Sequence, residues 1–373
     1  MIRVLHVVGK FNIGGAESRI MDIYRNMDRT QIQFDFMQHT EETCKFEHEA
    51  EELGAHIYRV PRFRIYNIFS YRRSWIAFMK EHPEIQVVHG HMTSTAAIYL
   101  PIAKKYGHAC TIAHARSAGV DQGLKGKITN LLRKNLAKRC DQCFACSKLA
   151  GEAVFGQKAM ENGKVEIVPN AIDVEKFAYN EEMRKQIRQK YNIDQNQFVI
   201  GHVGRFDTVK NHKYLLKVFA ACYQNNTAFR LMLLGDGPLK PEVQEQARQL
   251  GVEQAVIFAG NQRNIADYYQ AFDFFVLPSF YEGLPGTAIE AQTSGLAGIL
   301  SDTVTSEAIV TQQMWQKSIT IPAQMWADEI VAYRQKYDFE SRTSKVQEVR
   351  AAGFDVKEQT EKLSRFYQKV VES

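Results

Sequence analysis

The chain has 373 residues, of which 45% are hydrophobic and 24% charged, and this indicates a soluble globular protein of about two domains. No apolar run approaches the ~18 residues that a membrane span needs, and the first residues lead directly into a strand, so we expect a cytoplasmic protein. The net charge of +5 is uneven, because residues 1–174 carry 24 Lys and Arg against 18 Asp and Glu.

In the first half, short apolar runs alternate with helical patterns. The runs predict strands over residues 2–8, 33–37, 55–60, 85–88 and 109–113. This alternation predicts an α/β fold with a parallel sheet, helices on both faces, and ligands at the carboxyl ends of the strands.

The first strand-to-helix turn contains Gly14 and Gly15, in the sequence GGAE. It is not the G-x-G-x-x-G fingerprint, so a nicotinamide cofactor is disfavoured. The two glycines either permit a tight turn or let the backbone approach a ligand closely. Their place in the first turn of the predicted sheet favours a ligand.

Histidines lie at two predicted strand ends, with His89 and His91 after the fourth strand and His114 after the fifth. Three histidines suit zinc, but no carboxylate is placed to orient them, so we expect no metal. Three cysteines, spaced C-x2-C-x2-C from Cys140, also suit zinc or an iron–sulfur cluster. No fourth cysteine follows, and the run is better explained as a strand with buried thiols that enters a helix at Ser147.

Two stretches of the first half are strongly basic. Residues 59–75, RVPRFRIYNIFSYRRSW, contain five arginines, no acidic residue and several interleaved aromatic residues, and residues 125–139 are basic with leucines on one helical face. Such a mixture suits an anionic membrane surface. The alternatives are nucleic acid, or a solvated face whose aromatic residues belong to the core. We expect membrane docking and no nucleic-acid partner.

The second half begins after residues 165–177, which read as a strand and a Pro-Asn turn, and after a helix over 181–191. A new alternating series then opens with FVIGHVGRFDTVKNH. It places Arg205 at a strand's carboxyl end and Lys210 just before a helix. Two cations on one rim suit a diphosphate, whereas the alternative is a solvated pair.

The stretch 276–295, VLPSFYEGLPGTAIEAQTSG, reads as a strand, a loop and a helix that stops near Gly295. A loop with Gly and Pro that opens a helix offers free N–H groups and a helix dipole to an anion. Glu282 and Glu290 frame this loop and could accept hydrogen bonds from hydroxyl groups beside that anion. Alternatively, Glu290 forms a capping box with Thr287.

Together, the EGLP…EAQ…G stretch, GGAE, HARS around His114 and GRFDTVKNH resemble glycosyltransferase family four over nearly the whole chain. The closest likeness is to its bacterial exopolysaccharide and capsule branch. The resemblance implies a GT-B fold, with two Rossmann-like domains that face each other across a cleft. Residues 1–174 would form the acceptor-side domain and 175–354 the nucleotide-sugar domain, with a helix over about 355–373 that packs back on the first.

The resemblance also implies roles for individual residues. His114 would face the donor sugar in catalysis and Glu282 would position it, while His91 and Arg116 would lie on the acceptor side. Glu290 would hold the ribose hydroxyls. The residues implied to bind the donor are Gly14, Gly15, Arg205, Lys210, Arg263, Glu282, Gly283, Leu284, Pro285, Gly286, Thr287 and Glu290.

The expected activity is the transfer of a sugar, with retention, from a nucleotide-sugar to a hydroxyl of a glycan or lipid-linked glycan in surface polysaccharide biosynthesis. A UDP-sugar is the favoured donor. No Asp-x-Asp occurs in the chain, so we expect no metal and no cofactor. The enzyme would dock peripherally on the cytoplasmic face of the membrane. The rival readings are a nucleotide-sugar epimerase on the same fold and a non-enzymatic nucleotide-sugar sensor.

Overall fold

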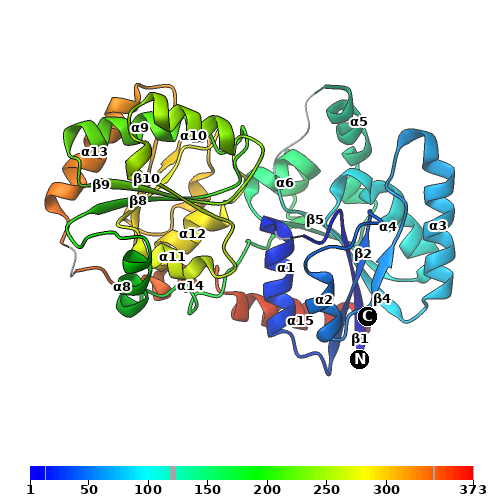
Figure 1. The fold of residues 1–373 in the computed structure, drawn as a ribbon. Coiled ribbons are helices and arrows are strands. Elements are labelled where there is room, and N and C mark those ends of the chain that lie inside the picture. Colours follow the sequence, from blue (N-terminus) through cyan, green and yellow to red (C-terminus); the bar gives the residue numbers. More distant parts are fainter. Residues whose placement is uncertain (13, 118–122, 339–340, 373) are drawn as a thin grey trace. The chain divides into compact units, whose positions relative to one another are not determined.

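The structure is a computed structural model and describes residues 1–12, 14–117, 123–338 and 341–372. Contacts divide the chain into two compact units (Figure 1). The first comprises Met1–Ala171 and Asp355–Ser373, and the second comprises Ile172–Phe354. The sequence places the first boundary slightly later, after residue 174.

The first unit is built on a seven-stranded sheet whose neighbouring strands are all parallel, in the order β3-β2-β1-β4-β5-β6-β7. The strands are β1 Ile2–Val8, β2 Ile32–Gln38, β3 Ile57–Arg59, β4 Ile85–Gly90, β5 Cys110–Ala115, β6 Gln142–Ala145 and β7 Val165–Ile167. The helices are α1 Gly15–Asn26, α2 Glu47–Glu52, α3 Ile68–Glu81, α4 Thr93–Gly107, α5 Gly123–Arg133, α6 Lys148–Phe155, α7 Gln157–Glu161 and α15 Val356–Glu372, with the 3-10 turns η1 Ile65–Asn67 and η2 Leu136–Lys138. The predicted parallel α/β architecture is confirmed.

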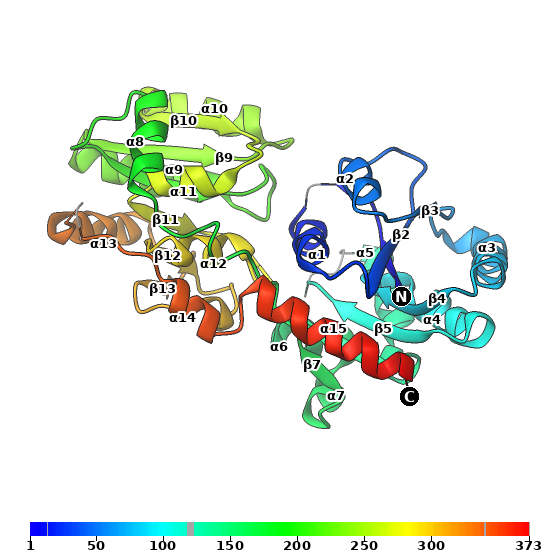
Figure 2. The ribbon, with the colours of Figure 1, turned by 90° about the horizontal axis from the view of Figure 1, so that it is seen from below.

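Helix α15 packs beside α1 and over β1 and β4 (Figures 1 and 2). Its buried stripe includes Leu363 and Tyr367, and it closes a core that also holds Val4 and Phe34. The period of 3.6 residues places these side chains on one face of the helix. The far end of the chain therefore completes the first unit.

Two strands of the first unit are longer than the sequence pattern predicts. Strand β4 continues through Gly90 and β5 through Ala115. His89 and His114 consequently lie inside strands, and each is fully buried. Only His91 of the three predicted histidines lies beyond a strand end.

The second unit has a six-stranded sheet, also parallel throughout, in the order β10-β9-β8-β11-β12-β13. The strands are β8 Phe198–Val203, β9 Phe229–Leu234, β10 Val256–Gly260, β11 Phe274–Leu277, β12 Ala297–Ser301 and β13 Met314–Lys317. The helices are α8 Glu181–Lys190, α9 His212–Asn225, α10 Lys240–Gln249, α11 Ile265–Ala271, α12 Gly286–Thr293, α13 Ala323–Lys336 and α14 Val346–Ala351, with the 3-10 turns η3 Glu253–Ala255 and η4 Ser306–Ala308. Helices α9, α10 and α13 cover one face, where Phe219 and Trp326 are buried.

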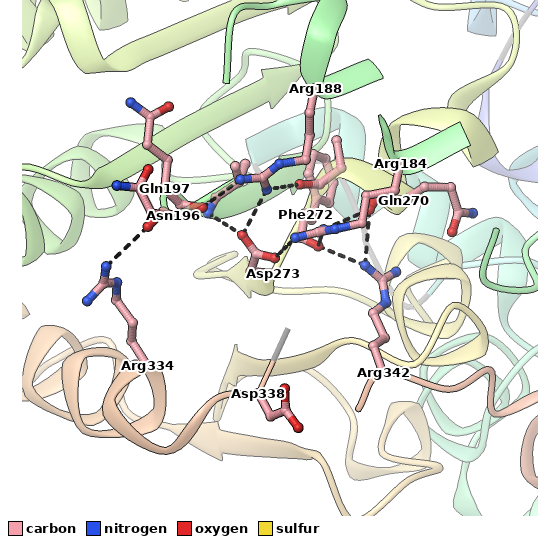
Figure 3. Close-up of polar contacts among 12 residues, drawn as sticks. Arg184, Arg188, Asn196, Gln197, Gln270, Phe272, Asp273, Arg334, Asp338 and Arg342 are labelled. Atoms are coloured by element: carbon pink, nitrogen blue, oxygen red, sulfur yellow. Dashed lines mark hydrogen bonds and ion pairs between the residues drawn. The ribbon is translucent and has the colours of Figure 1, made fainter. Parts of the chain in front are cut away.

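A buried charged cluster stabilises the amino-terminal end of β11 (Figure 3). Asp273 forms ion pairs with Arg184 at 2.5 Å and with Arg188 at 3.1 Å. Its Oδ2 also accepts a hydrogen bond from the backbone N–H of Val199 at 2.7 Å. Arg342 extends the cluster and donates to four backbone carbonyl oxygens, which lie in the last turn of α11 and just beyond the ends of α11 and α12. The cluster links segments that are far apart in sequence, and its single carboxylate is fully paired.

Candidate active site

The strand order reverses once in each sheet, and such a reversal marks where parallel sheets bind ligands. In the first unit the reversal lies between β1 and β4, and in the second it lies between β8 and β11. The crevice beyond the carboxyl ends of these strand pairs is therefore the candidate site in each unit. Several of the residues singled out in the sequence lie on the loops that leave these strands.

In the second unit, an ion pair spans the reversal point. Lys210 follows β8 and Glu282 follows β11, and their Nζ and Oε1 atoms are 2.6 Å apart. The two side chains are 17% and 18% exposed, so solvent reaches the pair. Ser279 donates its hydroxyl to the same oxygen of Glu282 at 3.1 Å. Lys210 and Glu282, for which the sequence predicts separate roles, are therefore joined in one ion pair.

Hydrogen bonds tie the two loops of this ion pair together. The side-chain amide of Asn211, just after Lys210, donates to the carbonyl of Pro278 at 3.1 Å. In the same region, the N–H of Phe280 donates to the carbonyl of Val209 at 2.8 Å. These bonds hold the end of β11 against the loop after β8, and so they set the distance between Lys210 and Glu282.

The start of α12 is open to an anion. The helix begins at Gly286, with Pro285 in the N-cap position and no capping side chain. The capping-box alternative is therefore wrong, because Thr287 lies inside the helix rather than at its cap. The hydroxyl oxygen of Thr287 is buried and has no hydrogen-bond partner among the described residues. Uncapped N–H groups beside an unpartnered hydroxyl suit a phosphate.

Glu290 reaches back toward this helix start. Its side chain is 2% exposed, and its Oε2 accepts the hydroxyl of Tyr269 at 2.8 Å. Its Oε1 lies 3.9 Å from the position that a Cβ on Gly286 would occupy. The carboxylate therefore lies close to the first turn of the helix.

The remaining predicted donor residues occupy the same edge or the start of α1. Arg205 and Arg263 are exposed, and Leu284 is buried beside Gly283. Gly14 is the extended N-cap of α1 and provides no side-chain cap, and Gly15 is exposed.

Four histidines of the first unit, His6, His89, His91 and His114, form a stacked array on the face covered by α15. The hydroxyl of Tyr367 lies 2.7 Å from Nδ1 of His89, and Nε2 of His89 lies 3.0 Å from Nδ1 of His114. A second pair joins Nδ1 of His6 to Nε2 of His91 at 2.9 Å. Neighbouring rings of the two pairs stack, with the centroids of His89 and His91 4.5 Å apart. Burial lowers the pKa of all four histidines, to about 3 for His6.

This array does not fit a metal ion held by neutral histidines. Ring nitrogens of His6, His89 and His91 lie within 4.8 Å of one another, which is close enough to consider a metal. However, the guanidinium Nε of Arg116 donates to Nδ1 of His91 at 3.2 Å. A neutral imidazole has one lone pair, so the proton of His91 must be on Nε2, which faces His6. Neither nitrogen of His91 is left for a metal, and a guanidinium beside the site would repel one.

Arg116, rather than His114, takes the outermost position after β5. It is partly exposed and makes hydrogen bonds to His91 and to Oδ1 of Asn170, the latter at 3.0 Å. His114 remains two residues deeper in the strand, and its Nε2 is buried without a hydrogen-bond partner among the described residues. The role expected for His114 stays a prediction.

The cysteine run is part of the core. Cys140 and Cys143 are buried with their sulfur atoms 3.5 Å apart, and Cys146 is also buried. Strand β6 and helix α6 lie where the sequence predicts them, and the hydroxyl of Ser147 caps α6 by accepting the N–H of Ala150. Free thiols packed as small apolar groups account for the spacing.

The basic segment over 59–75 divides into two faces. Tyr71 and Trp75 are fully buried, so part of its aromatic content belongs to the core. Ile65, Tyr66 and Phe69 are 62%, 80% and 81% exposed. We call the exposed set the aromatic-basic patch, and it consists of Arg62, Arg64, Ile65, Tyr66, Phe69, Arg72 and Arg73. In the second basic stretch, the side chain of Lys125 lies outside the described residues, Leu131 is 69% exposed and Leu136 is buried.

Sequence reasoning missed four residues of these sites, namely His6, Asn170, Tyr269 and Tyr367. His6 could have been found, because the two-residue period of β1 places it on the same face as Val4 and Val8. Asn170 could also have been found, because it follows the strand that the sequence predicts within residues 165–177. The contacts of Tyr269 and Tyr367 are non-local and leave no local pattern.

Two small hollows lie away from the strand reversals. One, of about 190 Å³, is lined by Tyr179 and Gln270 among others, and one of about 490 Å³ is lined by Asn26 and Ser364 among others. Neither is lined by a predicted site residue.

Comparison with known proteins gives consistent matches to both units. A family model described as Glycosyltransferase Family 4 matches residues 13–176, and one described as Glycosyl transferases group 1 matches residues 183–331. The putative glycosyltransferase EpsF of Bacillus subtilis is 34% identical over 349 residues, which cover 91% of each chain. The capsular polysaccharide biosynthesis glycosyltransferase CapH of Staphylococcus aureus is 23% identical over 337 residues, covering 88% of this chain and 90% of CapH.

Solved structures show the same fold. Alr3699/HepE of Anabaena in complex with UDP has a TM-score of 0.81 at 18% identity, covering 99% of this chain and all of that one. WaaG, a glycosyltransferase involved in lipopolysaccharide biosynthesis, has a TM-score of 0.73 at 16% identity, covering 98% of this chain and 99% of WaaG. The predicted GT-B fold, with its two Rossmann-like domains, is confirmed.

Proposed function

The chain belongs to the GT-B glycosyltransferases of family 4, in the bacterial exopolysaccharide and capsule branch, and from this premise we propose that it transfers a sugar from a UDP-sugar to a hydroxyl of a glycan or lipid-linked glycan. The anomeric configuration would be retained. The bond from the anomeric carbon to the diphosphate breaks, a bond to the acceptor oxygen replaces it, and the hydroxyl proton of the acceptor passes to the departing diphosphate. No residue is assigned as a nucleophile.

The observation that carries this proposal is the ion pair between Lys210 and Glu282, at the strand reversal of the second unit. An arriving diphosphate would attract Lys210 more strongly than one carboxylate does, because it offers more charge and more acceptor oxygens. Glu282 would then be free to accept a hydrogen bond from a sugar hydroxyl. Charge that develops on the departing diphosphate would be stabilised by Lys210, by Arg205 and by the uncapped start of α12.

Three further residues would contact the donor. Glu290 would accept hydrogen bonds from the ribose hydroxyls, and the backbone near Arg263 would read the base. His114 would face the donor sugar. Cations of the protein replace a metal in this scheme, and the engaged nitrogens of His91 support metal independence.

Relatives support the choice of substrates. Solved structures of HepE are complexes with UDP, with UDP and glucose, and with UDP-glucose. An Escherichia coli relative, 26% identical over 58% of this chain, is a UDP-Gal:alpha-D-GlcNAc-diphosphoundecaprenol alpha-1,3-galactosyltransferase. These names favour a UDP-sugar donor and a lipid-linked diphosphate acceptor for this chain.

The enzyme would work at the cytoplasmic face of the membrane. Among the described residues, no helix is long and apolar enough to cross a bilayer. The aromatic-basic patch instead suits peripheral docking, since its arginines would meet anionic headgroups and its Tyr66 and Phe69 would settle at the interface.

The test is a panel of nucleotides and nucleotide-sugars assayed by thermal shift. A ligand at 100 times its Kd stabilises the folded state by about 2.7 kcal/mol, so UDP and the right UDP-sugar should raise the Tm clearly. Lys210→Ala should abolish that rise, whereas Lys213→Ala, an exposed lysine on α9, should not. A panel in which no nucleotide raises the Tm, or in which Lys210→Ala behaves as the parent protein, would refute the donor site.

A further inference from the structure

Arg116 in the first unit carries a positive charge that has no ion-pair partner among the described residues. Its Nε donates to His91 and its Nη1 donates to Asn170, and both acceptors are uncharged. Among the described residues, no carboxylate lies within ion-pair distance of it. Burial lowers the pKa of Arg116 to about 10, so the guanidinium remains charged at neutral pH.

Other buried arginines of the chain are satisfied differently. Arg184 and Arg188 share the carboxylate of Asp273, and Arg342 donates to four carbonyls and one hydroxyl. Arg116 makes two hydrogen bonds, and its Nη2 has no hydrogen-bond partner among the described residues. Buried charges are normally paired, which makes this one a candidate for an anion supplied from outside.

The hydrogen-bond partners of Arg116, His91 and Asn170, orient its guanidinium without neutralising its charge. Because Nδ1 of His91 accepts from the guanidinium, its Nε2–H donates to Nδ1 of His6 at 2.9 Å. A neutral histidine pair thus holds one edge of the planar guanidinium group of Arg116, and Asn170 holds the other. A carboxylate in either place would orient the guanidinium equally well, but its negative charge would offset the attraction of the guanidinium for an anion.

The position of Arg116 agrees with a ligand site. His91, Arg116 and Asn170 follow the carboxyl ends of β4, β5 and β7, and β4 is one of the two strands between which the order reverses. Glu17, in the first turn of α1, is the acidic side chain that acts on Arg116 electrostatically, and burial raises its pKa.

We infer that Arg116, oriented by His91 and Asn170, forms a phosphate-binding subsite on the first unit, distinct from the Lys210 site of the second. The planar fork would bind two phosphate oxygens through Nη2 and the second hydrogen of Nη1. This inference rests on the proposed transferase function. The phosphate would come from a diphosphate-linked acceptor.

The experiment uses the full chain and begins with inorganic pyrophosphate as the probe. In a Lys210→Ala background, residual pyrophosphate binding measured by calorimetry should persist and should fall tenfold or more when Arg116→Gln is added. Arg365→Gln, which removes an exposed arginine of α15, is the matched control and should change nothing. This measurement needs no turnover, so it separates the subsite from the proposed activity.

Kinetics then test whether the acceptor supplies the phosphate. Arg116→Gln should raise KM for a diphosphate-linked acceptor tenfold or more, and should leave KM for the same glycan without phosphate and the Kd of UDP unchanged. An unchanged KM for the diphosphate-linked acceptor, or a rise in the Kd of UDP instead, would overturn the inference.

If Arg116→Gln fails to fold, Arg116→Lys and Asn170→Ala replace it. Lysine keeps the charge but loses the planar fork, and Asn170→Ala keeps the guanidinium but loses one anchor. Each should weaken pyrophosphate binding in the Lys210→Ala background by at least threefold. Wild-type-like binding in both would overturn the inference.

Discussion

Acidification should unfold this protein from the first unit, because that unit buries five neutral histidines. Burial is the leading cause that lowers the pKa of His6, His39, His89, His91 and His114, to about 3 for His6 and about 4 for His39. Each folded-state pKa lies below the unfolded value of about 6.5. Their contribution to stability is therefore complete above pH 6.5 and is lost as the pH falls toward the folded values.

The size of the effect follows from these pKa values. At pH 5.5 an unfolded imidazole gains about 1.4 kcal/mol by protonation that its buried form cannot gain, so five of them amount to about 7 kcal/mol. In the second unit, His202 and His212 have lowered pKa values and would contribute about 3 kcal/mol. Glu17 opposes the trend slightly, because its raised pKa favours the folded state as acid is added. A loss of 7 kcal/mol rivals the whole stability of a typical domain.

The assay is urea unfolding at pH 7.5, 6.5 and 5.5, with hydrogen exchange resolved by peptide to assign each transition to a unit. The midpoint should fall by the equivalent of about 2 kcal/mol between pH 7.5 and 6.5 and more steeply by pH 5.5, first for peptides of β1, β4 and β5. His89→Gln should flatten part of this dependence. A stability that stays flat down to pH 5.5, or a second unit that unfolds first, would refute the reasoning.

Three further changes test other parts of the structure. Glu290→Gln should weaken UDP binding roughly ten- to a hundredfold in calorimetry, through loss of a charged acceptor; unchanged affinity would show that Glu290 only supports Tyr269. Asp273→Ala should destabilise the second unit by about 3–5 kcal/mol in urea melts, because two buried arginines lose their carboxylate, and a loss below 1 kcal/mol would contradict that account. Phe69→Ser combined with Arg72→Glu should abolish salt-sensitive co-sedimentation with anionic vesicles, and binding that ignores both lipid charge and these substitutions would discard the docking surface.

The sequence predicts the fold well because its signals are local. Apolar runs, breakers and helical periods locate β1 to the residue, and the order of elements predicts parallel sheets. Strand ends are less certain, since β4 and β5 continue through polar residues that pack under α15. This extension moved His89 and His114 from the expected edge of the sheet into its interior.

The candidate site is only partly predictable, for a related reason. The sequence identifies Lys210 and Glu282, but their ion pair depends on two loops that are distant in the chain. The spacing of Thr287 and Glu290 matches a capping box, yet Pro285 takes the N-cap and shifts the helix start. The hydrogen bonds that hold Arg116 also cannot be predicted from the sequence, because Asn170 follows a different strand that is distant in the chain.

The discontinuous first unit has a consequence for biosynthesis. About 180 residues of the second unit separate Ala171 from the segment that forms α15, and a ribosome adds roughly 5–20 residues per second. For some ten to forty seconds, the nascent first unit lacks the helix that covers Val4, Phe34 and the histidines. During this interval its apolar face is available to chaperones or to other nascent chains, and arrival of Tyr367 ends the exposure. Translation speed through residues 172–354 therefore sets how long the newborn protein is vulnerable to aggregation.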